Sequence, residues 1–490
     1  MRKLSPMYNL ERLSSVSFPP GYAWALIAAM SVAVISLTVS FQAGVLSLLF
    51  VIVAWWVWQQ PVLGFFMLVI ISPLLPLLKV TQTISIATLI KDVIIVTLFV
   101  HLFLWPLLQK KLTYRRMVLI GPVIGLSLWV SVALLRADSR LLGILRTREI
   151  LLYILLYFIV LYLPRTKKFY YELLMWLFFS FAITVVASAY QWWFAIDSAV
   201  LRFEPAVKLW IPRVSSTFGH PSVFGHYLIL IAGICLAAVL VKTSRRVRAG
   251  AGFLLLAATL LIYLTYSRAV WLGFASLLIT IIGLVATASF KKYSVAAFPW
   301  RKLAICCLLL VMVTVAVAQF TRVGVFISSS FDSGYRSNQE RLEFLARLLA
   351  PLSNHEAIIG RGLGDVLAQN FREVTLTSYD IATGAARNVQ LAKNTTLVDN
   401  QYLKTLIELG LIGLLLYAWI YWRLLRTGVT TIFLRTGVPR IIALSALGWL
   451  ISFMLQAIFI DTWDIYPTNA LFWIMAGLVS ATSGNNKVAA

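Results

Sequence analysis

The sequence predicts an all-α membrane protein, a polytopic bundle of about 12 to 14 transmembrane helices with one long loop. Two observations support this prediction. Hydrophobic residues make up 61% of the 490-residue chain and charged residues only 12%, with a mean hydropathy of +0.88. A soluble domain does not have this composition. In addition, Lys and Arg are concentrated in alternate polar breaks between the apolar runs, which is typical of a chain that crosses a membrane repeatedly.

Apolar runs long enough to cross a hydrocarbon core of about 30 Å recur along the chain. Fourteen such runs are predicted spans, near residues 22–40, 43–58, 62–78, 88–108, 117–135, 149–163, 170–194, 222–241, 250–264, 269–289, 303–319, 402–424, 440–460 and 467–484. The number of spans is twelve if the short runs 43–58 and 62–78 form a re-entrant hairpin instead of crossing. Removing an adjacent pair of spans leaves the orientation of all later spans unchanged, so the charge pattern fits both numbers.

Five polar breaks carry Lys and Arg but no Asp or Glu, namely Gln109–Arg116, Pro164–Phe169, Val241–Gly250, Phe290–Lys302 and Trp422–Arg440. Together they hold 19 of the 42 basic residues. All acidic residues except Glu11 and Glu172 fall in or beside the alternate breaks. Because cytoplasmic loops are enriched in Lys and Arg, the acid-free breaks and both termini are predicted to be cytoplasmic. Any chemistry that needs carboxylates then takes place on the outer face.

The net charge of +24 does not indicate nucleic-acid binding, because orientation signals and lipid headgroup contacts account for much of it. The three cysteines, Cys235, Cys306 and Cys307, all lie in predicted spans. That placement argues against an extracytoplasmic disulfide and against a zinc site. No metal and no cofactor is expected.

One outer segment, residues 320–401, is far longer than the other loops. Within it, Ser337 to Leu349 has the apolar periodicity of an amphipathic helix at the membrane surface. The sequence Gly360–Arg361–Gly362–Leu363–Gly364–Asp365 predicts a flexible turn. This glycine cluster is not a dinucleotide site, since no strand precedes it and its spacing differs from the fingerprint.

The predicted outer face is rich in arginine, which indicates an anionic ligand. Arg136, Arg140, Arg146 and Arg148 share one outer break, and seven more arginines lie in the long loop. The alternative is that they contact lipid phosphates or pair with acids beside them. Arg213 and Arg268 border apolar runs, where a charge is costly unless it faces a cavity. A guanidinium group suits phosphate, although helix C-terminal carbonyls or a carboxylate could also satisfy a buried arginine.

Four stretches occur in order around the long loop: RVSSTFGHPSVFGHYL, TYSRAVWLG, ERLEFLARLLAPLSNHEAIIGRGLGD and VDNQYLKTLIELGLIGLLLY. With them, residues 205 to 425 resemble the O-antigen ligase and polysaccharide polymerase superfamily of bacterial integral membrane proteins. The resemblance implies a GT-C-like glycosyltransferase that transfers a glycan from undecaprenyl diphosphate on the outer face of the cytoplasmic membrane. It divides the chain into N-terminal helices (1–200), a catalytic region (201–425) and C-terminal helices (426–490).

The resemblance also implies roles for individual residues. Arg213 and Arg268 match the arginines thought to hold the lipid diphosphate, and Arg341 matches the arginine that opens the loop helix. Asp399 stands where the ligases have a histidine. The other residues expected to bind substrate are His220, Tyr266, Arg361, Asn400 and Tyr402.

Asp399 is the predicted base for an acceptor hydroxyl, because a carboxylate can accept the proton while arginines stabilise the departing diphosphate. The missing ligase histidine favours a polymerase, which transfers one lipid-linked glycan onto the next lipid-linked repeat unit. The alternative role for Asp399 is that of a helix N-cap. His355 is a second candidate base, and Asp365, Asp380 and Glu408 are secondary acid candidates. The spacing of His220 and His226 does not fit a metal pair on a helix.

Two rival functions share these features. An O-antigen ligase or a protein oligosaccharyltransferase would use the same donor with a different acceptor. A transporter or flippase of lipid-linked sugars would make no bond, but the sequence has no convincing internal repeat of the kind that many transporters show. The expected partners are the undecaprenyl-diphosphate-linked donor, a lipid-linked glycan acceptor and membrane lipids, together with a flippase and a chain-length regulator. Nucleic acid is not expected.

Overall fold

The computed structural model describes residues 41–76, 87–113, 115, 117–164, 166–194, 200–204, 209–241, 243–292, 352–364, 374–379, 386–391, 400–461 and 463–483. Two predicted spans, near 22–40 and 303–319, and the predicted loop helix at 337–349 lie outside these residues.

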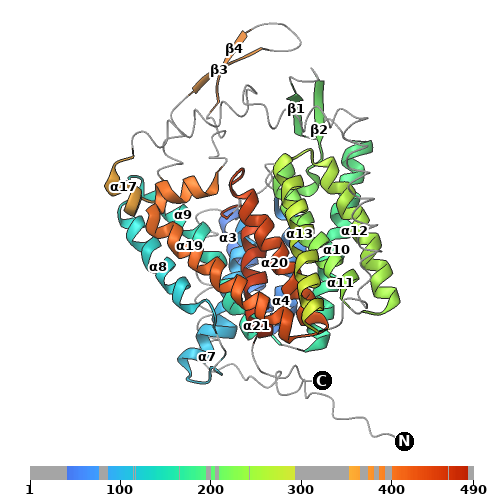
Figure 1. Ribbon diagram of the computed structural model, residues 1–490. Coiled ribbons are helices and arrows are strands. Elements are labelled where there is room, and N and C mark those ends of the chain that lie inside the picture. Colours follow the sequence, from blue (N-terminus) through green and yellow to red (C-terminus); the bar gives the residue numbers. More distant parts are fainter. Residues whose placement is uncertain are drawn as a thin grey trace, which may run out of the picture.

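The described part of the chain is a bundle of helices (Figure 1). Its helices are α3 (Phe41–Gln59), α4 (Pro61–Ile71), α6 (Ala87–Phe99) continued by the π-helix η1 (Val100–Leu104) and α7 (Trp105–Leu108), α8 (Ile120–Leu135), α9 (Arg140–Tyr162), α10 (Lys167–Trp193), η3 (Ser216–Phe218), α11 (Pro221–Leu240), α12 (Arg245–Leu264), α13 (Arg268–Lys292), α17 (Asn354–Ile359), α19 (Gln401–Leu434), α20 (Val438–Gln456) and α21 (Thr468–Ser483). Seven of the described helices are long and apolar enough to cross a membrane, which confirms the predicted all-α polytopic bundle.

Polar residues fix where many of these helices begin, as the breaks in hydrophobicity predict. The side chains of Ser139, Thr166 and Ser244 accept hydrogen bonds from the first turns of α9, α10 and α12. Each thereby satisfies a backbone N–H that has no partner inside the helix. The boundaries therefore follow local chemistry, and the apolar lengths between them determine the spans.

Two short β-hairpins lie beyond one end of the bundle (Figure 1). β1 (Val200–Glu204) pairs antiparallel with β2 (Leu209–Arg213), and β3 (Val374–Tyr379) pairs antiparallel with β4 (Ala386–Leu391). The sequence analysis did not predict either hairpin. We call this the hairpin end of the bundle; α17 lies there as well.

Hydrogen bonds join three of the acid-free breaks within the described residues. Arg115 Nη1 donates to the carbonyl oxygen of Leu163, 3.2 Å away, and Arg423 Nε donates to that of Val118 at 3.1 Å. These bonds join the break after α7 to the end of α9 and to the C-terminal half of α19. These three basic breaks thus lie together at the end of the bundle opposite the hairpins.

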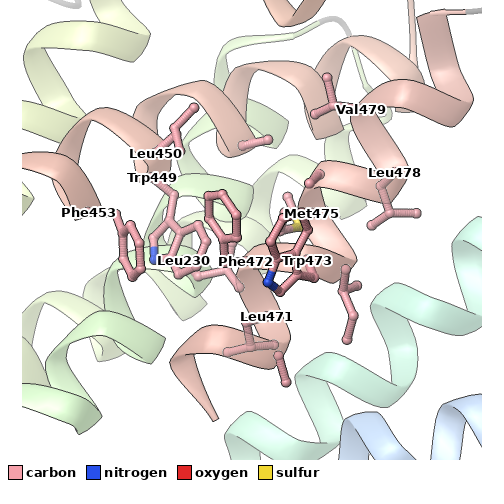
Figure 2. Close-up of a cluster of buried hydrophobic side chains, with 14 of the residues drawn as sticks. Leu230, Trp449, Leu450, Phe453, Leu471, Phe472, Trp473, Met475, Leu478 and Val479 are labelled. Carbon is pink, nitrogen blue, oxygen red and sulfur yellow. The ribbon is translucent and has the colours of Figure 1, made fainter. Parts of the chain in front are cut away.

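The most deeply buried of the seven membrane-length helices is α11, which packs along almost its whole length against α12, α13 and α20. At Gly225 the backbone approaches Val270 of α13 so closely that a Cβ would collide with the valine side chain. Aromatic rings from α20 and α21 pack beside α11, including Trp449, Phe453 and Phe472 (Figure 2). Tight packing of this kind holds helices together where apolar lipid offers no hydrophobic driving force.

α19 is broken near its start by Gly410, whose φ of 69° and ψ of −172° are not helical. The break frees carbonyl groups that other segments then satisfy. The backbone N–H of Arg361 donates to the Ile407 oxygen at 2.7 Å, and Trp129 Nε1 of α8 donates to the Leu409 oxygen at 2.7 Å. Such a break in an apolar helix is tolerated because protein groups replace the lost helical bonds.

The glycine-rich turn after α17 is packed against the bundle, which corrects the expectation of a flexible turn. Gly360, Gly362 and Gly364 all have positive φ, and a Cβ on Gly362 would meet the backbone of Arg136. Glycine is required here both for backbone conformation and for close approach. The long loop is therefore anchored in its middle to α8, α9 and α19.

We expect Gly410→Ala to destabilise the protein by about 2 to 4 kcal/mol, because the new methyl group would overlap the carbonyl oxygen of Ile358 at a backbone angle unfavourable to alanine. The thermal midpoint in detergent measures this effect. Gly283→Ala is the matched control, since nothing lies within 4 Å of a Cβ at that position of α13. Equal midpoints for the two variants would contradict the packing described for the break.

Candidate functional site

Arg213, at the end of β2, lies beside the turn that joins α12 to α13. Its Nε donates to the carbonyl oxygen of Thr265 at 3.1 Å, and the next residue, Val214, donates its N–H to Leu264 at 3.0 Å. Arg268 is the first residue of α13, three positions after Thr265. The structure therefore brings Arg213 to the segment that carries Arg268, although the two residues are 55 positions apart in the sequence.

His220 caps the start of α11 in the same region. Its Nδ1 accepts a hydrogen bond from the Ser222 N–H at 3.3 Å, and Pro221 occupies the first helical position. Ser222 Oγ lies 3.1 Å from Ser267 Oγ, which joins the start of α11 to the start of α13. Two helix N-termini, each with a partial positive charge, thus meet beside Arg213.

Two side chains of this region, His220 and Tyr266, are uncharged near neutral pH. The His220 side chain is accessible to solvent, but desolvation by the surrounding protein, together with the Arg213 charge, lowers its pKa to about 4. Burial raises the pKa of Tyr266 to about 12, and neighbouring Tyr263 acts in the same direction. Near neutral pH, Tyr266 is therefore a hydroxyl donor, while His220 is neutral.

α20 connects this region to the start of α19. The Gln456 side chain lies against Gly273 of α13, so closely that a Cβ on Gly273 could not fit. The carbonyl oxygen of the next residue, Ala457, accepts the Gln401 N–H of α19 at 2.8 Å. Arg268 precedes Gly273 by less than two helical turns, so the starts of α13 and α19 both lie beside the end of α20.

The predicted residues of α19 lie at this helix start. The Asn400 side chain caps the helix by accepting the Leu403 N–H at 3.0 Å. The capping role considered for Asp399 therefore belongs to Asn400. Tyr402 is half-buried, and its hydroxyl donates to the Met454 oxygen at 2.8 Å. Arg361 pairs with Glu356, 3.4 Å away, in the turn that packs on α19. Asp399 and Arg341 lie outside the described residues.

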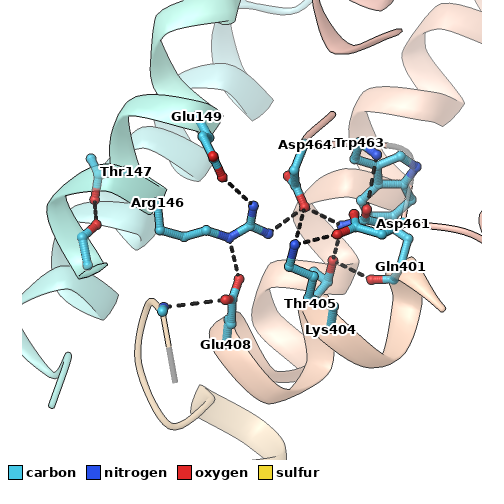
Figure 3. Close-up of polar contacts among 12 residues, drawn as sticks. Arg146, Thr147, Glu149, Gln401, Lys404, Thr405, Glu408, Asp461, Trp463 and Asp464 are labelled. Carbon is cyan, nitrogen blue, oxygen red and sulfur yellow. Dashed lines mark hydrogen bonds and ion pairs between the residues drawn. The ribbon is translucent and has the colours of Figure 1, made fainter. Parts of the chain in front are cut away.

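A network of buried charges joins the start of α19 to α9 and to the link between α20 and α21 (Figure 3). Arg146 of α9 is at its centre. Its Nε donates to Glu408 at 2.7 Å, its Nη1 to Glu149 at 3.1 Å, and its Nη2 to Asp464. The Arg146 and Glu408 side chains are only 2% and 1% exposed. Charges this deeply buried require full pairing.

Lys404 and Gln401 continue the network. Lys404 Nζ lies 2.5 Å from Asp461 and 3.3 Å from Asp464. Gln401 Nε2 donates to Asp464 at 2.9 Å, and Gln401 Oε1 accepts the backbone N–H of Trp463 at 3.0 Å. The Gly364 N–H donates to Glu408 at 3.3 Å, which attaches the glycine turn of the long loop to the same cluster.

The buried part of the network contains one more negative than positive group, since Glu408, Asp461 and Asp464 surround Arg146 and Lys404. Burial would raise the pKa of Asp464, but Arg146 and Lys404 hold it below its ordinary value. Burial raises the pKa of Asp461 to about 6 despite Lys404. One Asp461 oxygen is buried with no hydrogen-bond partner among the described residues. The pKa of Asp461 is therefore raised and that of Asp464 lowered, although both side chains are buried in one network.

The network corrects the expectation that Arg136 to Arg148 form one outer break. Arg140, Arg146 and Arg148 belong to α9, because the Ser139 cap starts the helix before them. Arg146 pairs with acids 262 and 318 positions away, not only with those beside it. Arg148 pairs with Asp92, Arg136 donates to the Ile359 carbonyl, and Arg140 is exposed.

Sequence analysis considered Arg146 only as one of four outer arginines that bind an anion or pair with acids beside them. It named Glu408 only as a secondary acid and assigned no role to Gln401, Lys404, Asp461 or Asp464. A local signal was present, because these charges interrupt or border apolar runs, where an unpaired charge is costly. No three His, Cys, Asp or Glu side chains in the described ranges are grouped to hold a metal ion.

Residues 251–418 match the family model described as O-Antigen ligase. The match confirms the resemblance to the O-antigen ligase and polymerase superfamily, and it supports a function of ligase or polymerase type on lipid-linked glycans in a membrane. It spans Arg268, the long loop and the start of α19, whereas Arg213 and His220 precede it. A search of curated proteins finds no match to the chain.

We expect the stability of the protein to depend on pH through Asp461. Its pKa of about 6 in the folded state exceeds the ordinary value of 3.8, so the folded protein binds a proton there that the unfolded chain has lost. This contribution is complete below about pH 4 and is lost as the pH rises through 6. It amounts to up to about 3 kcal/mol.

Asp461→Asn removes this titration at nearly constant volume. The variant should match the wild type in thermal midpoint near pH 4 and exceed it at pH 7. Asp138→Asn, at an exposed position, is the control and should show no such divergence. A midpoint difference for Asp461→Asn that does not change with pH would contradict the charge assignment.

Proposed function

We propose that the protein is a polysaccharide polymerase. It transfers an undecaprenyl-diphosphate-linked glycan onto a lipid-linked repeat unit at the outer face of the bacterial cytoplasmic membrane. In this proposal the hairpin end faces outward, and the acid-free breaks and both termini are cytoplasmic. The observation that carries it is the convergence of Arg213 with the starts of α11 and α13, inside a chain that matches the O-Antigen ligase family.

The donor diphosphate binds at this convergence. Arg213 and Arg268 provide guanidinium groups whose planar donors fit phosphate oxygens. The N-termini of α11 and α13 add backbone N–H groups and partial positive charge. Neutral His220 and Tyr266 supply further hydrogen-bonding groups to the diphosphate or the first sugar.

The acceptor binds at the start of α19. Asp399 precedes the Asn400 cap directly, and Arg341, Asn400, Tyr402 and Arg361 contribute to this side. The hydroxyl oxygen of the acceptor sugar attacks the anomeric carbon of the donor, and its proton passes to the Asp399 carboxylate. The bond between that carbon and the diphosphate oxygen breaks, so undecaprenyl diphosphate leaves with the electron pair. The arginines stabilise the charge that develops on it.

Asp399 in place of the ligase histidine is the reason for preferring a polymerase. The family description favours the second candidate, a ligase or protein oligosaccharyltransferase with the same donor and a different acceptor. The two functions differ only in the acceptor, so the reaction products separate them.

We expect substitutions at the donor site to lower donor affinity and a substitution at the acceptor site to lower kcat. Arg213→Ala and Arg268→Ala should each weaken donor binding by about tenfold or more, because each removes charged hydrogen bonds to the diphosphate. Asp399→Asn should leave donor binding unchanged and lower kcat by about 100-fold or more. Arg246→Ala, an exposed arginine at the opposite end, is the control for loss of charge. Equal loss of donor affinity in all three site variants would refute this division.

Product analysis tests the reaction itself. Purified protein in lipid, given a defined undecaprenyl-diphosphate-linked repeat unit, should form a ladder of longer lipid-linked glycans that disappears in Asp399→Asn. Gels and mass spectrometry measure it. Transfer only to an added lipid A core or protein acceptor would identify a ligase or oligosaccharyltransferase. The absence of any new covalent product with the cognate substrate would favour a transporter.

A further inference from the structure

We infer that Arg146 is a positioning residue for glycan transfer, acting through the buried network to fix the start of α19 and the glycine turn of the long loop. The inference rests on the proposed function, because it concerns the helix start next to Asp399. It differs from the donor-binding role of Arg213 and Arg268, since Arg146 is buried and its donors are directed at the protein's own carboxylates.

The connection from Arg146 to the helix start is short. Arg146 Nη2 and Gln401 Nε2 both donate hydrogen bonds to the same Asp464 oxygen, Oδ2. Gln401 is the first residue of α19, two positions after Asp399, and its backbone N–H and side-chain oxygen are also bound, to Ala457 and Trp463. Three hydrogen bonds thus fix this residue against the link between α20 and α21.

A second branch fixes the long loop. Glu408 accepts Arg146 Nε on one oxygen and the Gly364 N–H on the other. The Arg361 N–H binds Ile407 beside it, at 2.7 Å. One guanidinium group therefore aligns both chain segments that flank residues 365–399, the stretch containing the candidate base.

Only an arginine can make both connections at once. Its planar fork reaches Glu408, Glu149 and Asp464 in three directions, whereas a lysine ammonium is a single point of charge. Arg146→Lys preserves the charge balance of the buried cluster but cannot bridge the two branches. It is therefore the informative variant, and Gln401→Met tests the first branch at similar side-chain volume.

The experiment is a double-mutant cycle between Arg146→Lys and Asp399→Asn in full-length protein in lipid, with the lipid-linked repeat unit as donor and acceptor. Arg146→Lys should lower kcat by about 10- to 100-fold, because a small misplacement of a reacting group has an effect of this size. Donor Kd should stay close to that of wild type. The thermal midpoint should fall, because one buried carboxylate loses its contact with the cation, so rates are compared well below the midpoints of both proteins. In the Asp399→Asn background, Arg146→Lys should lower the residual rate by less than about threefold. The reason is that Arg146 acts through Asp399, so its effect on the rate should largely disappear once the carboxylate is gone.

Gln401→Met should resemble Arg146→Lys, and Arg140→Met, on the exposed face of α9, should resemble wild type. Rate losses that multiply in the double variant, or a matching loss of donor affinity in Arg146→Lys, would show a merely structural role and overturn the inference while the proposed function stands. If wild type instead uses a lipid A or protein acceptor, the proposed function fails and the cycle with that acceptor decides the positioning role. A protein that makes no covalent product overturns both.

Discussion

The fold depends on the pairing of Arg146 inside an apolar bundle. A guanidinium group that is 2% exposed has lost its water, and removing one partner from a buried ion pair typically costs about 3 to 5 kcal/mol. Its carboxylate partners come from α9 itself, from α19 and from the link between α20 and α21. The ion pairs hold these three parts of the bundle in one arrangement.

That arrangement also explains how α19 can be both broken and ordered. Gly410 interrupts the helix, and the freed Ile407 and Leu409 carbonyls accept N–H groups from the glycine turn and from Trp129 of α8. Glu408 lies between these carbonyls and holds Gly364. The helical break and the charge network therefore stabilise the same contact between the long loop and the bundle.

Sequence patterns predicted most of the described helices, because each span needs only a sufficient length of apolar residues and each boundary a local polar break. The family resemblance, and not these patterns, implied that Arg213 and Arg268 hold one diphosphate. The patterns could not predict the partners of Arg146, since acids 262 and 318 positions away leave no local signal. Asp399 and Asn400 are adjacent and both suit an N-cap, so only coordinates could assign the cap to Asn400.

The two aspartates of the α20–α21 link have different chemical states for a geometric reason. Asp464 Oδ2 accepts donors from Arg146, Lys404 and Gln401, so the ionised form is strongly favoured. Asp461 faces Lys404 alone, with one oxygen buried and unpartnered within the described structure. With two cations for three buried carboxylates, excess negative charge is least stabilised at Asp461, and a proton binds there most readily. Protonation at Asp461 balances the buried charge while leaving intact the Asp464 contacts that hold the start of α19.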